Sequence, residues 1–221
     1  MIKIAVSETV TKSVVDAAIL YNGIVKRLKK MYFGNRLVYK NLPSSFASGV
    51  PGTYVFEVPA TGQYAMHAVG GGGLTDNDGA GYGESCAGGG SGAYAKTVMS
   101  LIEGQEVLLS VGGCGGDTVI KIGDVEVCAS GGGGHGDVSD HKHPVKGVGG
   151  IARVGNESMI NGNDGTATHD SALQEPKCYG GSHAVAEYPY GRGGDCRFRV
   201  GLGEWEETAP QNGFADISKI D

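Results

Sequence analysis

The chain has 221 residues, of which 41 are glycine and 7 are proline, and its formal net charge is −6. Glycine is more than twice as frequent as the usual ~7%, but no Gly-X-Y period occurs, which excludes collagen. A hydrophobic content of 40% is too high for a disordered glycine-rich tail, so the sequence predicts a folded protein.

Charge and glycine are both segregated along the chain. Residues 1–40 carry eight Lys or Arg and two acidic residues, a net charge of 8 − 2 = +6, and the rest carries 10 − 22 = −12. Of the 41 glycines, 37 lie between Gly52 and Gly203. This predicts two modules with different partners, a basic module over residues 1–50 and a glycine-rich module over residues 51–221.

The sequence predicts neither export nor membrane insertion. Glu8 comes too early for the apolar region of a signal peptide, and no run of 18 apolar residues occurs. The five cysteines cannot all pair within one chain, so at least one is free or intermolecular, and none lies in a CxxC motif. We therefore expect synthesis in a reducing cytosol.

Two turn signals divide the basic module. Asn22-Gly23 and Gly34-Asn35 each separate two short apolar runs, a pattern typical of hairpins, which predicts a small β-meander. A helix is the competing prediction, because the apolar residues of residues 14–28 also keep helical spacing. The basic cluster consists of Lys26, Arg27, Lys29 and Lys30. It lacks the interleaved aromatic residues of a nucleic-acid platform, so we expect a solvated face or a docking face for an acidic partner, and no nucleic acid.

Strand patterns alternate with glycine runs from Thr53 onward. The predicted strands are 53–58, 63–69, 92–101, 106–111, 118–122 and 125–130, with a further one over NGFADISKI. At positions 69, 111 and 130 a strand runs directly into a glycine run. The repeat predicts a mainly β fold, a β-sandwich-like domain whose strands continue into glycine segments.

Glycine runs have a packed conformation available to them, polyglycine II, which rises ~3.1 Å per residue without internal hydrogen bonds. Their N–H and C=O groups point outward and must be paired when buried. Without Cβ atoms, such segments pack backbone to backbone and bond several neighbours. We therefore expect packed polyglycine-II helices that hold up the loops between them.

If the glycine runs are the scaffold, binding specificity belongs to the loops. The loops are residues 74–85, 135–147, 156–177 and 182–192. Tyrosine and arginine are typical of interface contacts. The candidate binding residues of these loops are Asp76, Asn77, Tyr82, His141, His143, Tyr188, Tyr190 and Arg192. Packing of the loop tyrosines on the scaffold is the alternative.

The best metal-binding pattern is His141-x-His143, because residues two apart project from one face of an extended segment. His135, Asp137 and Asp140 lie close in sequence, and a polar surface loop is the alternative. No Walker A or GxSxG motif occurs, and paired acids such as Glu206-Glu207 lack the context of a glycosidase. We expect no enzyme activity and no cofactor other than a metal ion at these histidines.

Two stretches resemble bacteriophage tail proteins. LYNGIVKRLKKMYFGNRLVY is similar to a short module near the start of many of them, and residues 53–221 resemble glycine-rich tail-fibre and tail-tip proteins. The second resemblance is carried by VFEVPATGQYAMHAVGGGG, GGGSGAYAKTVMSLIEGQEVLLSVGG and VEVCASGGGG. This alternation of strands, glycine runs and loops is similar to that of the distal adhesins of T-even-like phages, in which polyglycine-II helices display receptor-binding loops.

The resemblance implies a virion protein of the distal tail, assembled in the host cytoplasm. Its partners would be other tail or baseplate proteins and a host cell-surface receptor, either protein or glycan. The basic module and the glycine-poor stretch between Val154 and Cys178 depart from the T-even adhesins. Both an adhesin and a structural tail-tip connector or plug therefore stay open.

Overall fold

The computed structural model describes residues 18–21, 24–27, 30–33, 36–40, 42–78, 85–140, 142–169, 176–199, 202 and 204–220. These residues form strands, turns and extended segments and include no helix, as the predicted mainly β class requires. Accordingly, none of the residues described belongs to a helix that could span a membrane.

The basic module contains two separate antiparallel strand pairs. Strand β1 (Ala18–Tyr21) pairs with β2 (Ile24–Arg27), and β3 (Lys30–Phe33) pairs with β4 (Arg36–Lys40). The predicted β-meander and its helical alternative both stay predictions for the module as a whole. Lys26 and Arg27 lie in β2 and Lys30 in β3, whereas Lys29 lies outside the described residues.

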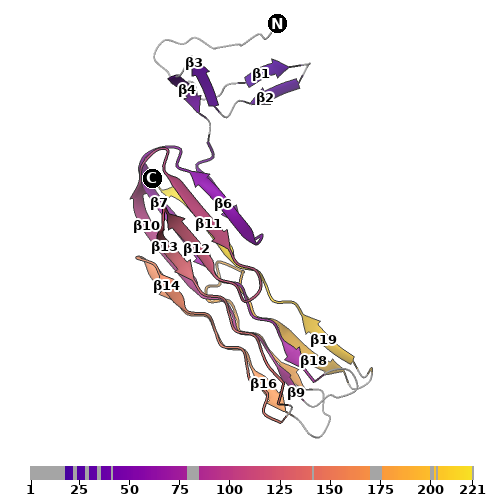
Figure 1. Cartoon of the computed structure of the whole chain (residues 1–221). Coiled ribbons are helices and arrows are strands. Elements are labelled where there is room, and N and C mark those ends of the chain that lie inside the picture. The colour runs from indigo at the N-terminus through magenta and orange to yellow at the C-terminus, as the bar shows by residue number, and fades with distance from the viewer. Residues whose placement is uncertain are drawn as a thin grey trace.

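Two five-stranded antiparallel sheets form a sandwich at one end of the glycine-rich module (Figure 1). The first sheet has the order β15-β10-β7-β20-β5 and the second has the order β14-β13-β12-β11-β6. The strands of the first sheet are β5 (Ser45–Ser48), β7 (Gly62–Val69), β10 (Tyr94–Leu101), β15 (Ser158–Ile160) and β20 (Phe214–Ile220). Those of the second are β6 (Gly52–Glu57), β11 (Glu106–Val111), β12 (Thr118–Ile122), β13 (Val125–Ser130) and β14 (Ala152–Val154). The predicted bounds of β11, β12 and β13 are confirmed exactly as the sequence pattern placed them.

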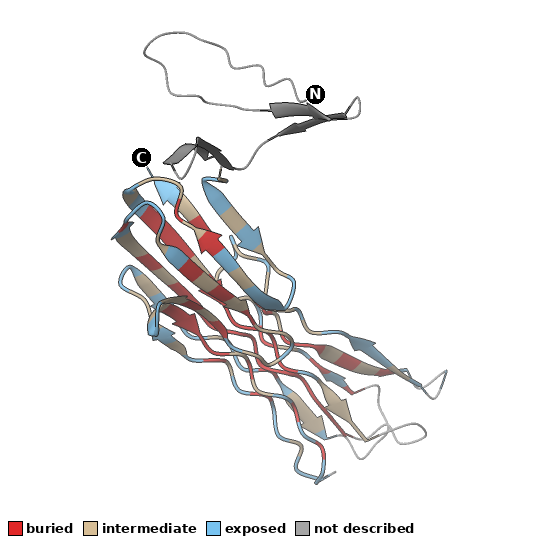
Figure 2. Ribbon diagram, turned by 45° about the horizontal axis from the view of Figure 1, so that its top comes forward, coloured by how far each residue is buried: buried red, intermediate tan, exposed pale blue. Residues whose placement is uncertain are grey.

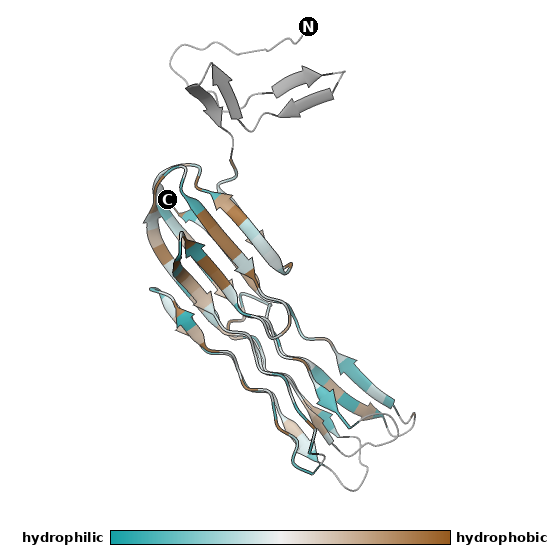
Figure 3. Ribbon diagram, viewed as in Figure 1, coloured by the Kyte–Doolittle hydropathy of each residue, from teal (hydrophilic) through white to brown (hydrophobic). Residues whose placement is uncertain are grey.

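The core lies between the two sheets and follows the alternation of the strands. Val107, Leu109 and Val111 of β11 face inward, and the first sheet contributes Tyr64, Met66 and Ile217. Each large aliphatic side chain buried in this way stabilises the fold by about 1.5–3 kcal/mol. Figure 3 shows the same concentration of apolar residues in the sandwich strands. This core anchors the strands that continue into the glycine runs.

Beyond the sandwich, the glycine segments run side by side as extended chains and bond to many neighbours. The amides of Gly70, Gly71, Gly72 and Gly73 donate in turn to the carbonyls of Ala93, Gly116, Gln211 and Gly90, at 2.8–3.0 Å. Four successive residues thus bond to three separate segments. An ordinary strand bonds to at most two neighbours, so this pattern is that of packed polyglycine II and not of a sheet.

The segment 88–92 lies at the centre of this glycine lattice. Backbone hydrogen bonds join it to the segments 70–73, 131–134, 147–150, 162–166, 180–181 and 191–194. A Cβ atom at Gly90 would overlap the Val148 carbonyl, and one at Gly89 would overlap the Gly73 carbonyl. The close approach of backbone to backbone is therefore what requires glycine here. Figure 2 shows that burial continues from the sandwich along these segments.

At the far end of the lattice, the segments end in two small three-stranded sheets. One has the order β16-β9-β8, with β8 (Asp76–Asn77), β9 (Ser85–Ala87) and β16 (Ala167–His169). The other has the order β17-β18-β19, with β17 (Lys177–Cys178), β18 (Asp195–Arg199) and β19 (Glu204–Thr208). We call this end the distal end. The chain enters the sandwich at the opposite, proximal end, because Ser45 pairs with Ser218 near the end of β20 (Figure 1).

Candidate functional site

The lattice brings segments that are distant in sequence together at the distal end. Residues 76–77, 85–87, 167–169, 177–178, 195–199 and 204–208 form the two small sheets there. Hydrogen bonds of the lattice, such as Gly136 N–H to Leu74 C=O at 2.9 Å, position the segments from which they emerge. Tyr82 lies outside the described residues, and so does half of its loop, residues 79–84.

Asp76 and Asn77, predicted to contact a receptor, tie distal segments to one another. The Asp76 carboxylate accepts hydrogen bonds from the Asn77 amide at 3.0 Å and from the Val138 amide at 3.0 Å. The Asn77 side-chain amide donates to the Glu207 carboxylate of β19. Both residues are half-buried. Through these contacts the two residues hold segments of the distal end in position relative to one another.

The 135–147 loop is closed by a bridge between Asp137 and Val145, whose amides and carbonyls exchange hydrogen bonds at 2.9 and 2.7 Å. His143 Nδ1 lies 3.0 Å from the Asp140 carboxylate, and this bond lowers the pKa of Asp140. His135 lies against Gly115 instead. His141 lies outside the described residues, so the predicted histidine metal site stays a prediction.

Tyr188 and Tyr190 pack where the sandwich strands pass into the lattice, which we call the waist. Tyr190 stacks on Phe214 with ring centroids 4.4 Å apart, and Tyr188 stacks on His67 at 4.9 Å. Both tyrosines join a cluster that includes Tyr94. This is the alternative that the sequence analysis left open, tyrosines seated on the scaffold. Arg192 forms an ion pair with Asp195 and is half-buried.

A buried polar group lies beneath Tyr188 on the outer face of the first sheet. His67 Nδ1 lies 2.8 Å from the Tyr94 hydroxyl, and His67 Nε2 lies 4.0 Å from Asp216. Burial, with a smaller contribution from Lys96, lowers the pKa of His67 to about 4. Burial also raises the pKa of Asp216 to about 6. The imidazole is therefore neutral at pH 7 and the carboxylate is costly to ionise.

The sequence analysis missed the outward face of the β17–β18–β19 sheet, which we call the distal face. It consists of Lys177, Tyr179, Asp195, Arg197, Arg199, Glu204, Glu206 and Thr208, which alternate with inward residues such as Cys196 and Phe198. A cavity of about 240 Å³ is lined by Lys177, Tyr179, Arg197 and Glu206, among others. A neighbouring one of about 270 Å³ is lined by Arg199, Leu202, Glu204, Trp205 and Glu206.

The distal face combines exposed apolar groups with charged groups. Arg199 pairs with Glu206 across the hairpin, while Tyr179 and Leu202 are 59% and 64% exposed. Exposed aromatic and aliphatic groups beside charges of both signs suit contact with a protein or a glycan. The period-2 alternation of DCRFR and EWEET carried the signal that would have found this face.

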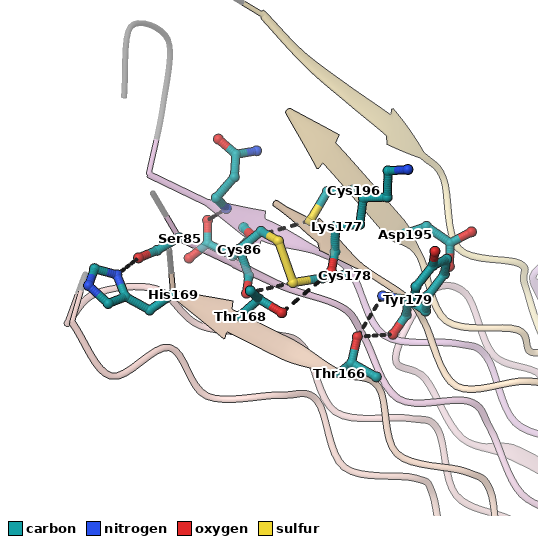
Figure 4. Close-up of a disulfide and its surroundings, with 12 residues drawn as sticks. Ser85, Cys86, Thr166, Thr168, His169, Lys177, Cys178, Tyr179, Asp195 and Cys196 are labelled. Atoms are coloured by element: carbon teal, nitrogen blue, oxygen red, sulfur yellow. Dashed lines mark hydrogen bonds between the residues drawn. A yellow bond between two sulfur atoms is a disulfide. The ribbon is translucent and has the colours of Figure 1, made fainter. Parts of the chain in front are cut away.

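Three of the five cysteines meet at the distal end. Cys86 and Cys178 form a disulfide, with Cα atoms 6.0 Å apart, and Cys114, Cys128 and Cys196 are free. The prediction that at least one cysteine stays unpaired within the chain is thus consistent with the structure. Cys128 lies in the sandwich core and donates to the Ala95 carbonyl at 3.3 Å. Cys196 lies beside the disulfide (Figure 4).

No protein-family model matches the chain, and no curated protein matches it. The resemblance to tail-fibre and tail-tip proteins therefore stays a prediction made from the quoted motifs.

Proposed function

We propose that the protein is a bacteriophage tail-tip or tail-fibre component that binds the host cell surface through its distal end. The observation that carries the proposal is the glycine lattice. Its segments continue from the strands of the packed sandwich and are hydrogen-bonded to one another. They lead to the exposed distal face at the opposite end. Function on this proposal is binding without covalent chemistry, and several copies on a virion would add avidity.

The basic module is the proposed attachment point to the tail or baseplate. Its net charge of +6 contrasts with −12 for the rest of the chain, so the two parts suit different partners. The chain enters the sandwich at the proximal end, whereas the distal face lies at the other end of the lattice. That arrangement separates virion attachment from receptor contact.

A structural connector of the tail tip is the second candidate function. One observation favours it: Val148, Ile151 and Met159 are exposed on the flank of the lattice and the sandwich edge. Val148 and Ile151 line an apolar hollow together with Gly131, Gly150 and Arg153, among others. An apolar flank of this kind suits contact with another virion protein. On this proposal the flank, and not the distal face, is the functional surface.

Adsorption competition distinguishes the two functions. Host cells are saturated with the purified full chain, and the virions that still attach are counted. An adhesin blocks adsorption, and a double variant Tyr179→Ala, Leu202→Ala loses at least tenfold in blocking potency. The matched control is Ile102→Ala, which removes a side chain that is 68% exposed at the proximal turn.

The competing result is equally definite. If labelled protein does not bind host cells and adsorption proceeds at saturating protein, the connector function is favoured. Equal blocking by the distal variant and by wild type would place the receptor contact elsewhere than the distal face.

A further inference from the structure

Three cysteine sulfurs converge at the distal end from three strands of two different sheets. Cys86 is the middle residue of β9, and Cys178 and Cys196 lie opposite each other in the β17–β18 ladder. The three sulfur atoms lie within 4.8 Å of one another, and all three residues are buried. Figure 4 shows the Cys196 side chain directed toward the disulfide.

Packing and one disulfide do not by themselves require this arrangement. The disulfide uses only the Cys86 and Cys178 sulfurs, yet the Cys196 sulfur lies within 4.8 Å of both. The three cysteines are themselves the buried hydrophobic cluster at this end, with Trp205 partly buried against them. Cys128 shows the ordinary alternative, a buried thiol among aliphatic side chains of the sandwich. The distal cluster instead gathers three soft ligands in one place.

We propose that Cys86, Cys178 and Cys196 form a zinc site when the disulfide is reduced. Zinc binds thiolate sulfur at about 2.3 Å in tetrahedral geometry, so its ligand sulfurs lie roughly 3.8 Å apart. Reduction therefore has to let the two disulfide sulfurs, ~2.05 Å apart when bonded, separate by about 1.7 Å, while the Cys196 sulfur moves closer to them by about 1 Å at most. Soft thiolates select Zn²⁺ over Mg²⁺ or Ca²⁺. A water molecule supplies the fourth ligand.

The two states interconvert by a balanced reaction. Two molecules of a thiol reductant reduce the Cys86–Cys178 bond, giving two protein thiols and one reductant disulfide. Binding of Zn²⁺ then releases three protons, one from each thiol. The same steps run in reverse when a disulfide oxidant removes the electrons and the metal leaves.

The consequence is a distal end that stays cross-linked in either redox environment. The disulfide joins β9 to β17, and the zinc ion would join the same strands and β18. A reducing cytosol would hold the zinc form and an oxidising exterior the disulfide form. This inference goes beyond the proposed function and does not depend on it.

Metal content of the full chain tests the proposal. The protein is produced and purified with a thiol reductant and Zn²⁺, passed through a desalting column, and analysed by elemental mass spectrometry. We expect one zinc per chain in wild type and in the exposed-cysteine control Cys114→Ser. We expect at least a tenfold lower occupancy in Cys196→Ser, which retains the disulfide pair and so folds under oxidising conditions.

Cobalt replacement gives a second readout. Reduced wild-type protein with Co²⁺ should show the sulfur-to-cobalt charge-transfer absorption, and oxidation with a disulfide oxidant should abolish it while removing two titratable thiols. Undiminished zinc in Cys196→Ser, or no metal in reduced wild type at excess Zn²⁺, would overturn the proposal.

Discussion

Individual glycines differ sharply in how much the fold depends on them. A Cβ at Gly90 would overlap the Val148 backbone, whereas one at Gly113 would meet Pro51 at 3.8 Å, an ordinary contact. Neither glycine has a positive φ, so backbone conformation alone does not distinguish them. The difference is crowding by neighbouring backbone, which cannot rotate away as a side chain can.

We therefore predict that Gly90→Ala lowers the free energy of unfolding by about 3 kcal/mol or more, at the upper end of overpacking effects. Gly113→Ala should change it by less than about 0.5 kcal/mol, because it meets no backbone and reduces the entropy of the unfolded chain. Urea denaturation of both variants measures the contrast. Equal effects would show that the lattice is not tightly packed at its centre.

Two residues at the waist make opposite contributions to the pH dependence of stability. His67 has its pKa lowered from 6.5 to about 4, so its contribution to the free energy of unfolding is lost as pH falls from 6.5 toward 4. Asp216 has its pKa raised from 3.8 to about 6, so its contribution is present at low pH and lost as pH rises through 6. Between pH 4 and 6 the two effects oppose each other.

Replacing either residue should reveal the pH dependence of stability that the other one causes. Relative to wild type, Asp216→Asn should lose stability as pH falls from 6 to 4, by up to about 1.4 kcal/mol per pH unit. His67→Asn should gain stability relative to wild type over the same window. Denaturation midpoints at half-unit pH intervals give the two difference curves, and curves parallel to wild type would contradict the assignment.

At the scale of elements, the 182–192 loop is held by its tyrosines. Tyr190 stacks on Phe214 at the start of β20, and Tyr188 covers His67 of β7. The loop backbone is also tied to the lattice, since the Gly92 amide donates to the Gly191 carbonyl at 2.7 Å. A loop with these contacts acts as a brace of the waist.

Truncation of Tyr190 to alanine should therefore cost about 1–2 kcal/mol of stability, less than a fully buried aromatic because the ring is half-exposed. Tyr179→Ala, on the exposed distal face, should change stability by less than about 0.5 kcal/mol. Thermal unfolding compares the two. If Tyr190→Ala left the thermal stability unchanged, Tyr190 would not hold the 182–192 loop in place, and the loop would again be a candidate contact surface.

At the scale of the whole molecule, the lattice transmits the order of the sandwich to the distal end. Each segment is bonded to several others, and the central segment 88–92 is bonded to all sides. Glycine costs roughly 0.5–1 kcal/mol per residue in conformational entropy. Intersegment hydrogen bonds, each worth a net ~0.5–1.5 kcal/mol, offset that cost.

Amide hydrogen exchange should reveal this order. We predict that the amides of residues 88–93 exchange as slowly as those of the central strand β7, because both open only with large parts of the fold. Mass spectrometry of peptic peptides resolves the two segments. Rapid exchange over 88–93, as in a flexible glycine linker, would show that the lattice hydrogen bonds do not persist in solution.

The sequence by itself predicted the seven longer strands of the sandwich and the glycine segments, but not β5, β8, β9 or β14 to β19. The alternation of EVLLSV, TVIKI and VEVCAS marks β11, β12 and β13, because one face of each strand is buried, and runs such as Gly70–Gly73 have no side chain to pack except backbone to backbone. Only the tertiary structure decided which residues meet. Tyr188 and Tyr190 sit on the waist because β7, β10 and β20 present His67, Tyr94 and Phe214 there, and Cys86, Cys178 and Cys196 converge because the lattice aligns three segments. The local sequence pattern indicates which residues of a strand are exposed, whereas contacts between distant segments depend on hydrogen bonds that join residues more than a hundred positions apart.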